Sequence, residues 1–395
     1  MSPSPHRRLR LGIAGLGRAF TLMLPTLTAH PRLELVAAAD PRPEARERFA
    51  KDYGARVYDN VSDLCTDPSV EAVYVATPHQ HHAEHVIAAA SRGKHVLVEK
   101  PMAIALDEAS AMIAAAEKAG VHLVVGHSHS FDAPILRARE VIRAGTLGRV
   151  RMITAMNFTD FLYRPRRPEE LDTGQGGGVI FSQAAHQVDI VRLLAGSRVT
   201  SVRAATGAWD TGRPTEGAYS SMLMFDDGTF ASLSYSGYGH FDADEFCDWV
   251  GETGRAKDPA AYGTARRALA GAAGAAAETA AKNARNYGGE GYARGGAGET
   301  PWHEHFGLVV ASCERGDVRP TPKGVMVYGN ETRELIPLAK PAVPRAEVID
   351  ELCAAVFEGR APLHDGWWGR ATLEVCIAML RSARERREIA LHPMG

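Results

Sequence analysis

The segment GGGVIFSQAAHQVDIVRLL, residues 176–194, carries three polar side chains at a spacing that suits chemistry on one helical face. Ser182, His186 and Asp189 follow one another at intervals of four and three residues, which places them on the same side of an α-helix. An imidazole with an ordinary pKa of ~6.5 can accept and release a proton near neutral pH. The alternative is a half-buried histidine that bonds a backbone carbonyl, and the segment alone favours that alternative.

A second candidate is Lys100, in the segment VLVEKPMAI at residues 96–104. It directly follows an apolar run that is typical of a buried strand. In doubly wound folds, ligands bind in the crevice at the carboxyl ends of the parallel strands. Lys100 would stand at that crevice, whereas the alternative is an ordinary solvated lysine.

The secondary-structure elements that must position these residues follow two different patterns along the chain. Short apolar runs alternate with helical patterns up to about residue 126, which predicts an α/β domain with a doubly wound parallel sheet. Five strands are expected, at residues 9–15, 33–39, 71–76, 94–99 and 121–126. From residue 149 the strands lack intervening helices, and DDG at 226–228 is typical of a hairpin, so an α+β domain with an open, mainly antiparallel sheet is expected.

The expected domain boundaries follow from these two patterns of secondary structure. Residues 1–127 are predicted to form a dinucleotide-binding Rossmann domain, and residues 128–343 a domain for substrate binding and oligomerisation. An Ala- and Gly-rich insertion at about 255–300 is expected to be part loose helix and part flexible loop. Residues 344–395 are predicted to be helices that pack on the domains.

The segment GIAGLGRAF, residues 12–20, follows the first predicted strand and opens a helix. Gly15 and Gly17 fit the first two glycines of a dinucleotide fingerprint, which let the backbone approach a pyrophosphate at the helix N-terminus. Phe20 takes the third glycine position, a departure from the pattern. Asp40 ends the second strand, where a carboxylate accepts hydrogen bonds from the adenosine ribose and favours NAD over NADP. Arg42 could soften that preference.

The charge and the cysteine content indicate which binding partners and which cellular compartment to expect. The chain has 395 residues, a formal net charge of −2 and five cysteines without a CxxC pair. We therefore expect a cytoplasmic protein with no nucleic-acid or membrane partner, no disulfide framework and no zinc-thiolate site. The N-terminal segment has no long apolar stretch, so a signal peptide is not expected.

Taken in order, the segments GIAGLGRAF, AAADP, VATPHQHHAEH, VLVEKP and GGGVIFSQAAHQVD resemble the Gfo/Idh/MocA oxidoreductases, the family of glucose–fructose oxidoreductase and inositol dehydrogenase. The resemblance implies a nicotinamide cofactor, NAD or else NADP, between a Rossmann domain and a second domain. It also implies a homodimer or homotetramer. Residues expected to contact the cofactor, besides Gly15, Gly17, Phe20 and Asp40, are Arg18, Ala19, Thr77, Pro78, His79, His82, Glu99, Lys100 and Pro101.

The resemblance also implies that Lys100 and His186 meet near the substrate. As a hypothesis, His186 takes the proton of a ring carbinol as hydride leaves, and Lys100 stabilises the developing alkoxide. Which of the two is the base stays open. The Lys100–Pro101 bond is expected to be cis, as in relatives.

One departure from the family pattern and one further resemblance bear on the substrate. Inositol-type relatives carry Asp where this chain has Ser182, which weakens the case for a sugar or inositol. Within residues 157–194, the stretch NFTDFLYRPRRPEELDT…QGGGVIFSQAAHQVDIVRLL resembles the dehydrogenases of phthalate cis-4,5-dihydrodiol. Its arginines could hold ring carboxylates by bidentate hydrogen bonds, or could simply pair with the acidic residues of the same loop. The side chains expected to bind substrate are Ser182, Asp189, Arg164, Arg166, Arg167 and His129.

Several histidines raise the question of a metal. His81 and His85 stand four residues apart on a predicted helix, and His127 and His129 follow the last strand of the first domain. A metal-dependent lyase would need carboxylate partners that the sequence does not identify, so no metal site is predicted. A non-catalytic nicotinamide-binding regulatory protein is the remaining alternative, and the presence of both Lys100 and His186 argues against it.

Overall fold

The computed structural model describes residues 7–272, 274–292 and 301–392. The chain divides into two compact units, and each is built from more than one stretch of sequence. The first comprises Met1–His127, Thr279–Gly298 and Val343–Leu373, and the second comprises Ser128–Glu278, Glu299–Ala342 and Glu374–Gly395. The predicted fold class, a parallel Rossmann sheet followed by an open and mainly antiparallel one, is confirmed.

The first unit contains a parallel six-stranded sheet in the order β3-β2-β1-β4-β5-β6. Its strands are β1 (Leu9–Ala14), β2 (Leu33–Ala39), β3 (Arg56–Tyr58), β4 (Ala72–Val75), β5 (His95–Val98) and β6 (Leu123–Val125). The three-residue strand β3 adds to the five that the sequence predicts. Because the strands are parallel, their carboxyl ends share one edge, and the loops after β1, β4 and β5 meet there.

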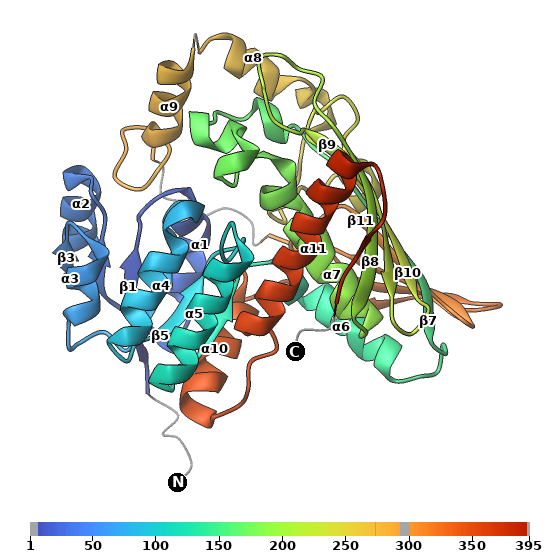
Figure 1. The fold of residues 1–395 in the computed structure, drawn as a ribbon, viewed down its shortest axis with the longest axis horizontal. Helices are drawn as coiled ribbons and strands as arrows, with labels where there is room; N and C mark the ends of the chain where they lie inside the picture. Colours follow the sequence, from blue (N-terminus) through green and yellow to red (C-terminus); the bar gives the residue numbers. More distant parts are fainter. Residues whose placement is uncertain (1–6, 273, 293–300, 393–395) are drawn as a thin grey trace. The chain divides into compact units, whose positions relative to one another are not determined.

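Helices cover both faces of this sheet, as the alternating pattern predicts. They are α1 (Arg18–Ala29), α2 (Pro43–Tyr53), α3 (Val61–Thr66), α4 (His82–Ser91), α5 (Leu106–Ala119) and α10 (Ala346–Glu358). Helix α4 packs on β5 and on α5 (Figure 1). Strands β1, β4 and β5 are almost wholly buried, which explains their continuous apolar runs.

The second unit contains a nine-stranded sheet in the order β14-β13-β12-β11-β7-β10-β9-β8-β15. Its strands are β7 (Val150–Phe158), β8 (Val199–Gly207), β9 (Ala218–Phe225), β10 (Phe230–Ser236), β11 (Leu308–Cys313), β12 (Gly316–Thr321), β13 (Gly324–Tyr328), β14 (Arg333–Pro337) and β15 (Ile389–Ala390). Every pair is antiparallel except β7 with β10. Burial alternates along β9, as expected when one face is covered.

Two helices cover that buried face. Helix α6 (Ala133–Arg143) packs on β12 and β13, and α7 (Ala185–Ala195) packs on β7 and on α6. Helix α11 (Gly366–Glu385) runs from the first unit into the second. No helix among the described residues is long and apolar enough to cross a membrane.

The helix expected at 176–194 differs from a regular α-helix. Residues Ile180–Ala184 form a π-helical turn, and α7 begins only at Ala185. The preceding glycines shape the entry, since Gly178 has φ +78° and an added Cβ would collide with the side chain of Glu216. Ser182 therefore lies in the π turn, and the expected α-helical spacing holds only from Ala185 onward.

The Ala- and Gly-rich segment forms two helices, α8 (Thr264–Ala270) and α9 (Ala275–Ala284). The loop expected at 288–298 lies mostly outside the described residues. The boundary between the two units falls inside α9, after Glu278.

Candidate active site

The turn after β1 is built to admit a diphosphate. Gly15 has φ +96°, and a Cβ there would stand 2.9 Å from the carbonyl oxygen of Ala76. Gly17 is the N-cap of α1, and a Cβ at Gly17 would meet nothing within 4 Å. Open space at a helix N-terminus, with backbone N–H groups facing outward, fits the pyrophosphate of a dinucleotide. Arg18 and Ala19 form the first turn of that helix.

Phe20, at the third glycine position, does not stand in this turn. Its ring is fully buried and packs edge-on against Tyr287, with ring centroids 5.3 Å apart, and against Phe49 at 6.0 Å. The Tyr287 hydroxyl donates a hydrogen bond of 2.7 Å to Asp52. Part of the predicted insertion is thus core of the first unit. Tyr287 carried no signal in the sequence, because a lone tyrosine beside glycines is typical of a loop.

Asp40 directly follows β2 and holds the turn in place. Its carboxylate accepts a hydrogen bond from the Leu16 backbone N–H at 2.8 Å, and it pairs with the Arg42 guanidinium at 3.0 Å. Arg42 also donates to the Leu16 carbonyl at 2.9 Å. Arg42, expected to modify the cofactor preference, therefore lies against the carboxylate that is expected to bind the ribose.

The segment after β5 brings Lys100 to the same edge of the sheet. The preceding residue, Glu99, accepts a hydrogen bond of 2.5 Å from the buried hydroxyl of Tyr74, and burial raises the pKa of the Glu99 carboxyl. The Lys100–Pro101 peptide bond is cis. Glu99 thus anchors the backbone on one side of Lys100.

His82 anchors the backbone on the other side. Its ring is fully buried, with Nδ1 2.9 Å from the Pro101 carbonyl oxygen and Nε2 2.9 Å from that of Thr77. Burial lowers the pKa of His82 to about 4. A neutral ring donates a hydrogen bond to one of these two carbonyl oxygens and packs against the other. His82 therefore lies between the Thr77 loop and the segment that carries Lys100, and we regard it as a positioning residue. Pro78 and His79 continue the same loop into α4.

In the second unit His186 lies in the first turn of α7 and is buried. Its Nδ1 is 3.4 Å from the Ser128 hydroxyl and 3.4 Å from the His129 backbone nitrogen. The His186 ring also packs on His129, with centroids 4.7 Å apart, and on Phe306 at 4.8 Å. Phe306 was not predicted, because it is a lone aromatic before a strand and far from His186 in the sequence.

The other side chains expected near His186 lie around the same helix. Asp189 is buried and accepts a hydrogen bond of 3.4 Å from the Ser130 hydroxyl, and Arg192 lies 3.8 Å away. Ser182 is half-buried in the π turn. The trio expected from the spacing is therefore spread over a π turn and an α-helix.

The three arginines of the 161–178 loop differ in their surroundings. Arg164 pairs with Asp160 at 2.8 Å and with Glu252 at 3.3 Å. Arg166 donates to the Phe161 carbonyl at 2.7 Å, and its guanidinium stands 3.6 Å above the Phe161 ring.

Arg167 lies 3.6 Å from Glu169, and its Nε makes no hydrogen bond to any described residue. Arg166 also lies 3.6 Å from Glu170. The Arg167–Glu169 and Arg166–Glu170 pairs agree with the alternative given above, in which the arginines pair with acidic residues of their own loop. Asp172 does not take part, because it accepts instead from Gly174 and Gln175.

Comparison with known proteins identifies this arrangement. Residues 9–127 match the oxidoreductase family with an NAD-binding Rossmann fold, and residues 135–257 match the Gfo/Idh/MocA C-terminal domain. The chain is 46% identical, over 95% of its own length and 95% of the relative's, to the 1-carboxy-3-chloro-3,4-dihydroxycyclohexa-1,5-diene dehydrogenase of Comamonas testosteroni. The chain belongs to the Gfo/Idh/MocA family of oxidoreductases. It is an NAD-binding dehydrogenase, as the sequence predicts.

Two further curated relatives are less similar to this chain. The trans-1,2-dihydrobenzene-1,2-diol dehydrogenase of Mus musculus is 30% identical over 58% of this chain and 68% of its own. The scyllo-inositol 2-dehydrogenase of Bacillus subtilis is 29% identical over 50% of this chain and 57% of its own. Among solved structures, a dehydrogenase from Bordetella bronchiseptica RB50 superposes with a TM-score of 0.91 at 43% identity, covering 97% of this chain and 100% of that one.

Proposed function

We propose that this chain oxidises a carboxylated cyclic cis-dihydrodiol, such as phthalate 4,5-dihydrodiol, to the corresponding catechol. The observation that carries the proposal is the 46% identity, along nearly the whole of both chains, to a dehydrogenase named for a carboxylated dihydroxycyclohexadiene. Oxidation of one carbinol in such a ring gives a ketone that tautomerises to an aromatic catechol, so the forward direction is strongly favoured. A place in aromatic catabolism, including phthalate degradation, follows from this substrate.

The first unit supplies the residues for cofactor binding. NAD, when bound, supplies the acceptor for the hydride. The Gly15–Gly17 turn and the N-terminus of α1 would hold its pyrophosphate, and Asp40 would accept from the ribose hydroxyls. Arg42, next to Asp40, would admit NADP as a weaker alternative, because a guanidinium can pair with a 2′-phosphate.

Lys100 and His186 would act on one alcohol oxygen of the substrate. The ammonium of Lys100 would donate a hydrogen bond to that oxygen and stabilise its developing negative charge. The imidazole of His186 would hold or move the proton, and the Ser128 and His129 contacts at Nδ1 would orient the ring. Ser182, Asp189 and His129 would supply further polar contacts.

Recognition of the carboxylate would fall to the arginine loop. Arg164 and Arg166 are held by groups of their own unit, which leaves less of each guanidinium for a ligand. Arg167 retains a buried Nε without a hydrogen bond to any described residue. We therefore assign the main contact with a substrate carboxylate to Arg167.

The open sheet supports a homo-oligomer. Met152 on β7, Phe230 on β10 and Met224 on β9 pair in register across three neighbouring strands. Both methionines are more than a third exposed, an apolar row that a dimer or tetramer would cover. A cytoplasmic location fits such an NAD-dependent enzyme.

The deciding experiment is a spectrophotometric screen of NAD and NADP reduction with carboxylated cis-dihydrodiols, inositols and sugars. We expect the fastest reduction of NAD with a carboxylated dihydrodiol. Rapid turnover of an inositol with none of the dihydrodiol would favour the sugar or inositol alternative, to which scyllo-inositol 2-dehydrogenase lends support. No turnover of any substrate would favour a regulatory protein.

Variants on the best substrate then test the assigned residues. His186→Asn and Lys100→Met should each lower kcat by roughly 10²–10⁴-fold, the usual contribution of a positioned proton-transfer group, with little change in the Kd for NADH. Exposed His81→Asn and Lys118→Met serve as matched controls that should retain wild-type turnover. Near-wild-type kcat in His186→Asn would end the assignment.

A further inference from the structure

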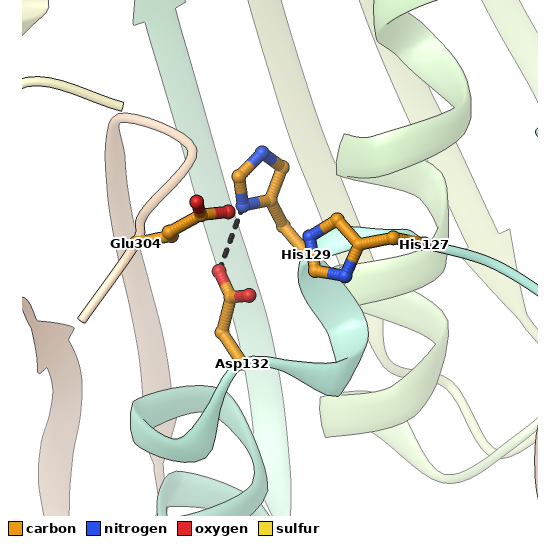
Figure 2. A group of neighbouring side chains, drawn as sticks. All are labelled: His127, His129, Asp132 and Glu304. Carbon is orange, nitrogen blue, oxygen red and sulfur yellow. Dashed lines mark hydrogen bonds and ion pairs between the residues drawn. The ribbon is translucent and has the colours of Figure 1, made fainter. Parts of the chain in front are cut away.

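Four side chains that the proposed chemistry does not require as a set converge near the start of α6. They are His127, His129, Asp132 and Glu304 (Figure 2), and one potential ligand atom from each lies within 4.8 Å of all the others. Three of the four are buried and Glu304 is half-buried. His129, Asp132 and Glu304 belong to the second unit, and His127 immediately precedes its first residue.

Local structure brings the first three together. His129 opens a 3₁₀ turn (His129–Phe131), and Asp132 is the N-cap of α6, so both side chains project from one tight bend. The His129 Nδ1 and an Asp132 carboxylate oxygen are 2.7 Å apart. Glu304 comes from the segment before β11, far along the chain, and Figure 2 shows its carboxylate directed at the same imidazole.

The charge of this group favours a bound cation. The Asp132 carboxylate is buried and the Glu304 carboxylate is half-buried close to it, so a positive charge between them would be stabilised by both. A divalent ion would neutralise both, and two imidazoles with two carboxylates form a donor set that suits zinc. Zinc–ligand distances of about 2.0–2.2 Å place tetrahedral ligand atoms roughly 3.4 Å apart, so the observed group needs only small side-chain rotations to close.

We propose that His127, His129, Asp132 and Glu304 bind a divalent transition-metal ion, with Zn²⁺ as the preferred ion. The site lies next to the candidate active site, because the backbone nitrogen of His129 contacts His186 and their rings are 4.7 Å apart. A bound ion would fix the bend that carries this contact. Its role is therefore to position His186, and the site does not depend on the identity of the substrate.

The sequence could not reveal this site. The spacing HSHSFD offers two imidazoles and a carboxylate, but a tetrahedral site needs the fourth ligand that only the fold brings in. The absence of a metal site predicted from the sequence rested on missing carboxylates, and Asp132 and Glu304 are those carboxylates.

The test is metal binding by the full-length, tag-free protein after chelator treatment and dialysis. Zn²⁺ should bind with a stoichiometry of one per chain in calorimetry and in elemental analysis, and should raise the melting temperature. Replacement by Co²⁺ should give the visible absorption of a tetrahedral site. Asp132→Asn and Glu304→Gln should each weaken Zn²⁺ binding by at least tenfold while leaving the far-UV circular dichroism unchanged.

The matched control is the His81→Gln, His85→Gln double variant. These two histidines stand four residues apart at the start of α4, with rings 5.8 Å apart, and bear no carboxylate of the proposed group. The double variant should bind Zn²⁺ as the wild type does. The proposal is overturned if the wild type binds no stoichiometric metal, or if only the control variant loses the ion. These measurements involve no substrate. The metal-site proposal can therefore be refuted while the proposed dehydrogenase activity holds, and the dehydrogenase proposal can be refuted while the metal site holds.

Discussion

The pH dependence of stability should reveal the role of His82. The buried ring stands between the carbonyl oxygens of Thr77 and Pro101, each 2.9 Å from a ring nitrogen, and burial lowers the pKa of His82 to about 4. In the unfolded chain the ordinary value of ~6.5 applies. The unfolded state therefore binds the proton more readily between those two values, and stability must fall as the pH drops from about 6.5 toward 4.

The magnitude follows from the two pKa values. Linkage gives a loss of about 2 kcal/mol at pH 5 and about 3 kcal/mol below pH 4, relative to pH 8. The His82→Leu substitution is of similar volume, and in this variant the pH-dependent loss of stability due to His82 disappears. At pH 8 the variant instead loses the hydrogen bond from the neutral ring, which should cost about 1–3 kcal/mol because a buried carbonyl is left without its donor.

The wild type should thus be the more stable protein at pH 8, and its advantage should shrink by about 2 kcal/mol at pH 5. Urea unfolding of both proteins at pH 8, 6.5 and 5, followed by circular dichroism, measures the difference at each pH. Titrating groups that the two proteins share cancel in that difference. Exposed His81→Leu is the control, and its difference from wild type should stay small at every pH. A difference between wild type and His82→Leu that does not change with pH would refute the reasoning.

Three further perturbations have defined outcomes. Gly15→Ala places a Cβ at φ +96° and 2.9 Å from a backbone oxygen, so it should cost at least ~1–2 kcal/mol and weaken NADH binding in a fluorescence titration; unchanged binding would contradict the assigned turn. Arg42→Ala frees the Asp40 carboxylate and should raise the ratio of kcat/KM for NAD over NADP by about tenfold, or ~1.4 kcal/mol, and a lower ratio would argue against the pairing. Glu278→Gln leaves the buried Arg213 without its 2.8 Å partner and should lower the free energy of unfolding by roughly 3–5 kcal/mol in urea titrations, whereas a neutral effect would show that the ion pair contributes little.

Features that depend on contacts between residues close in the sequence could be predicted from the sequence. Period-two and period-3.6 patterns, and glycines at the turn after β1, reflect contacts within a few residues, so the two sheets and the dinucleotide turn could be predicted. The π turn before α7 could not, because it depends on how Gly178 and Glu216 fit together across the second unit.

The sequence by itself determined the class of this protein, an NAD-binding oxidoreductase, because short motifs in a fixed order carry that chemistry. It also nominated Lys100 and His186 as the reactive groups that we propose. Tertiary structure decided what each polar side chain contacts. It placed Phe306 against His186, Tyr287 against Phe20, and Glu304 beside His129. Residues far apart in the chain come into contact only when the helices pack on the sheets. The periodicity within a single segment does not predict such contacts.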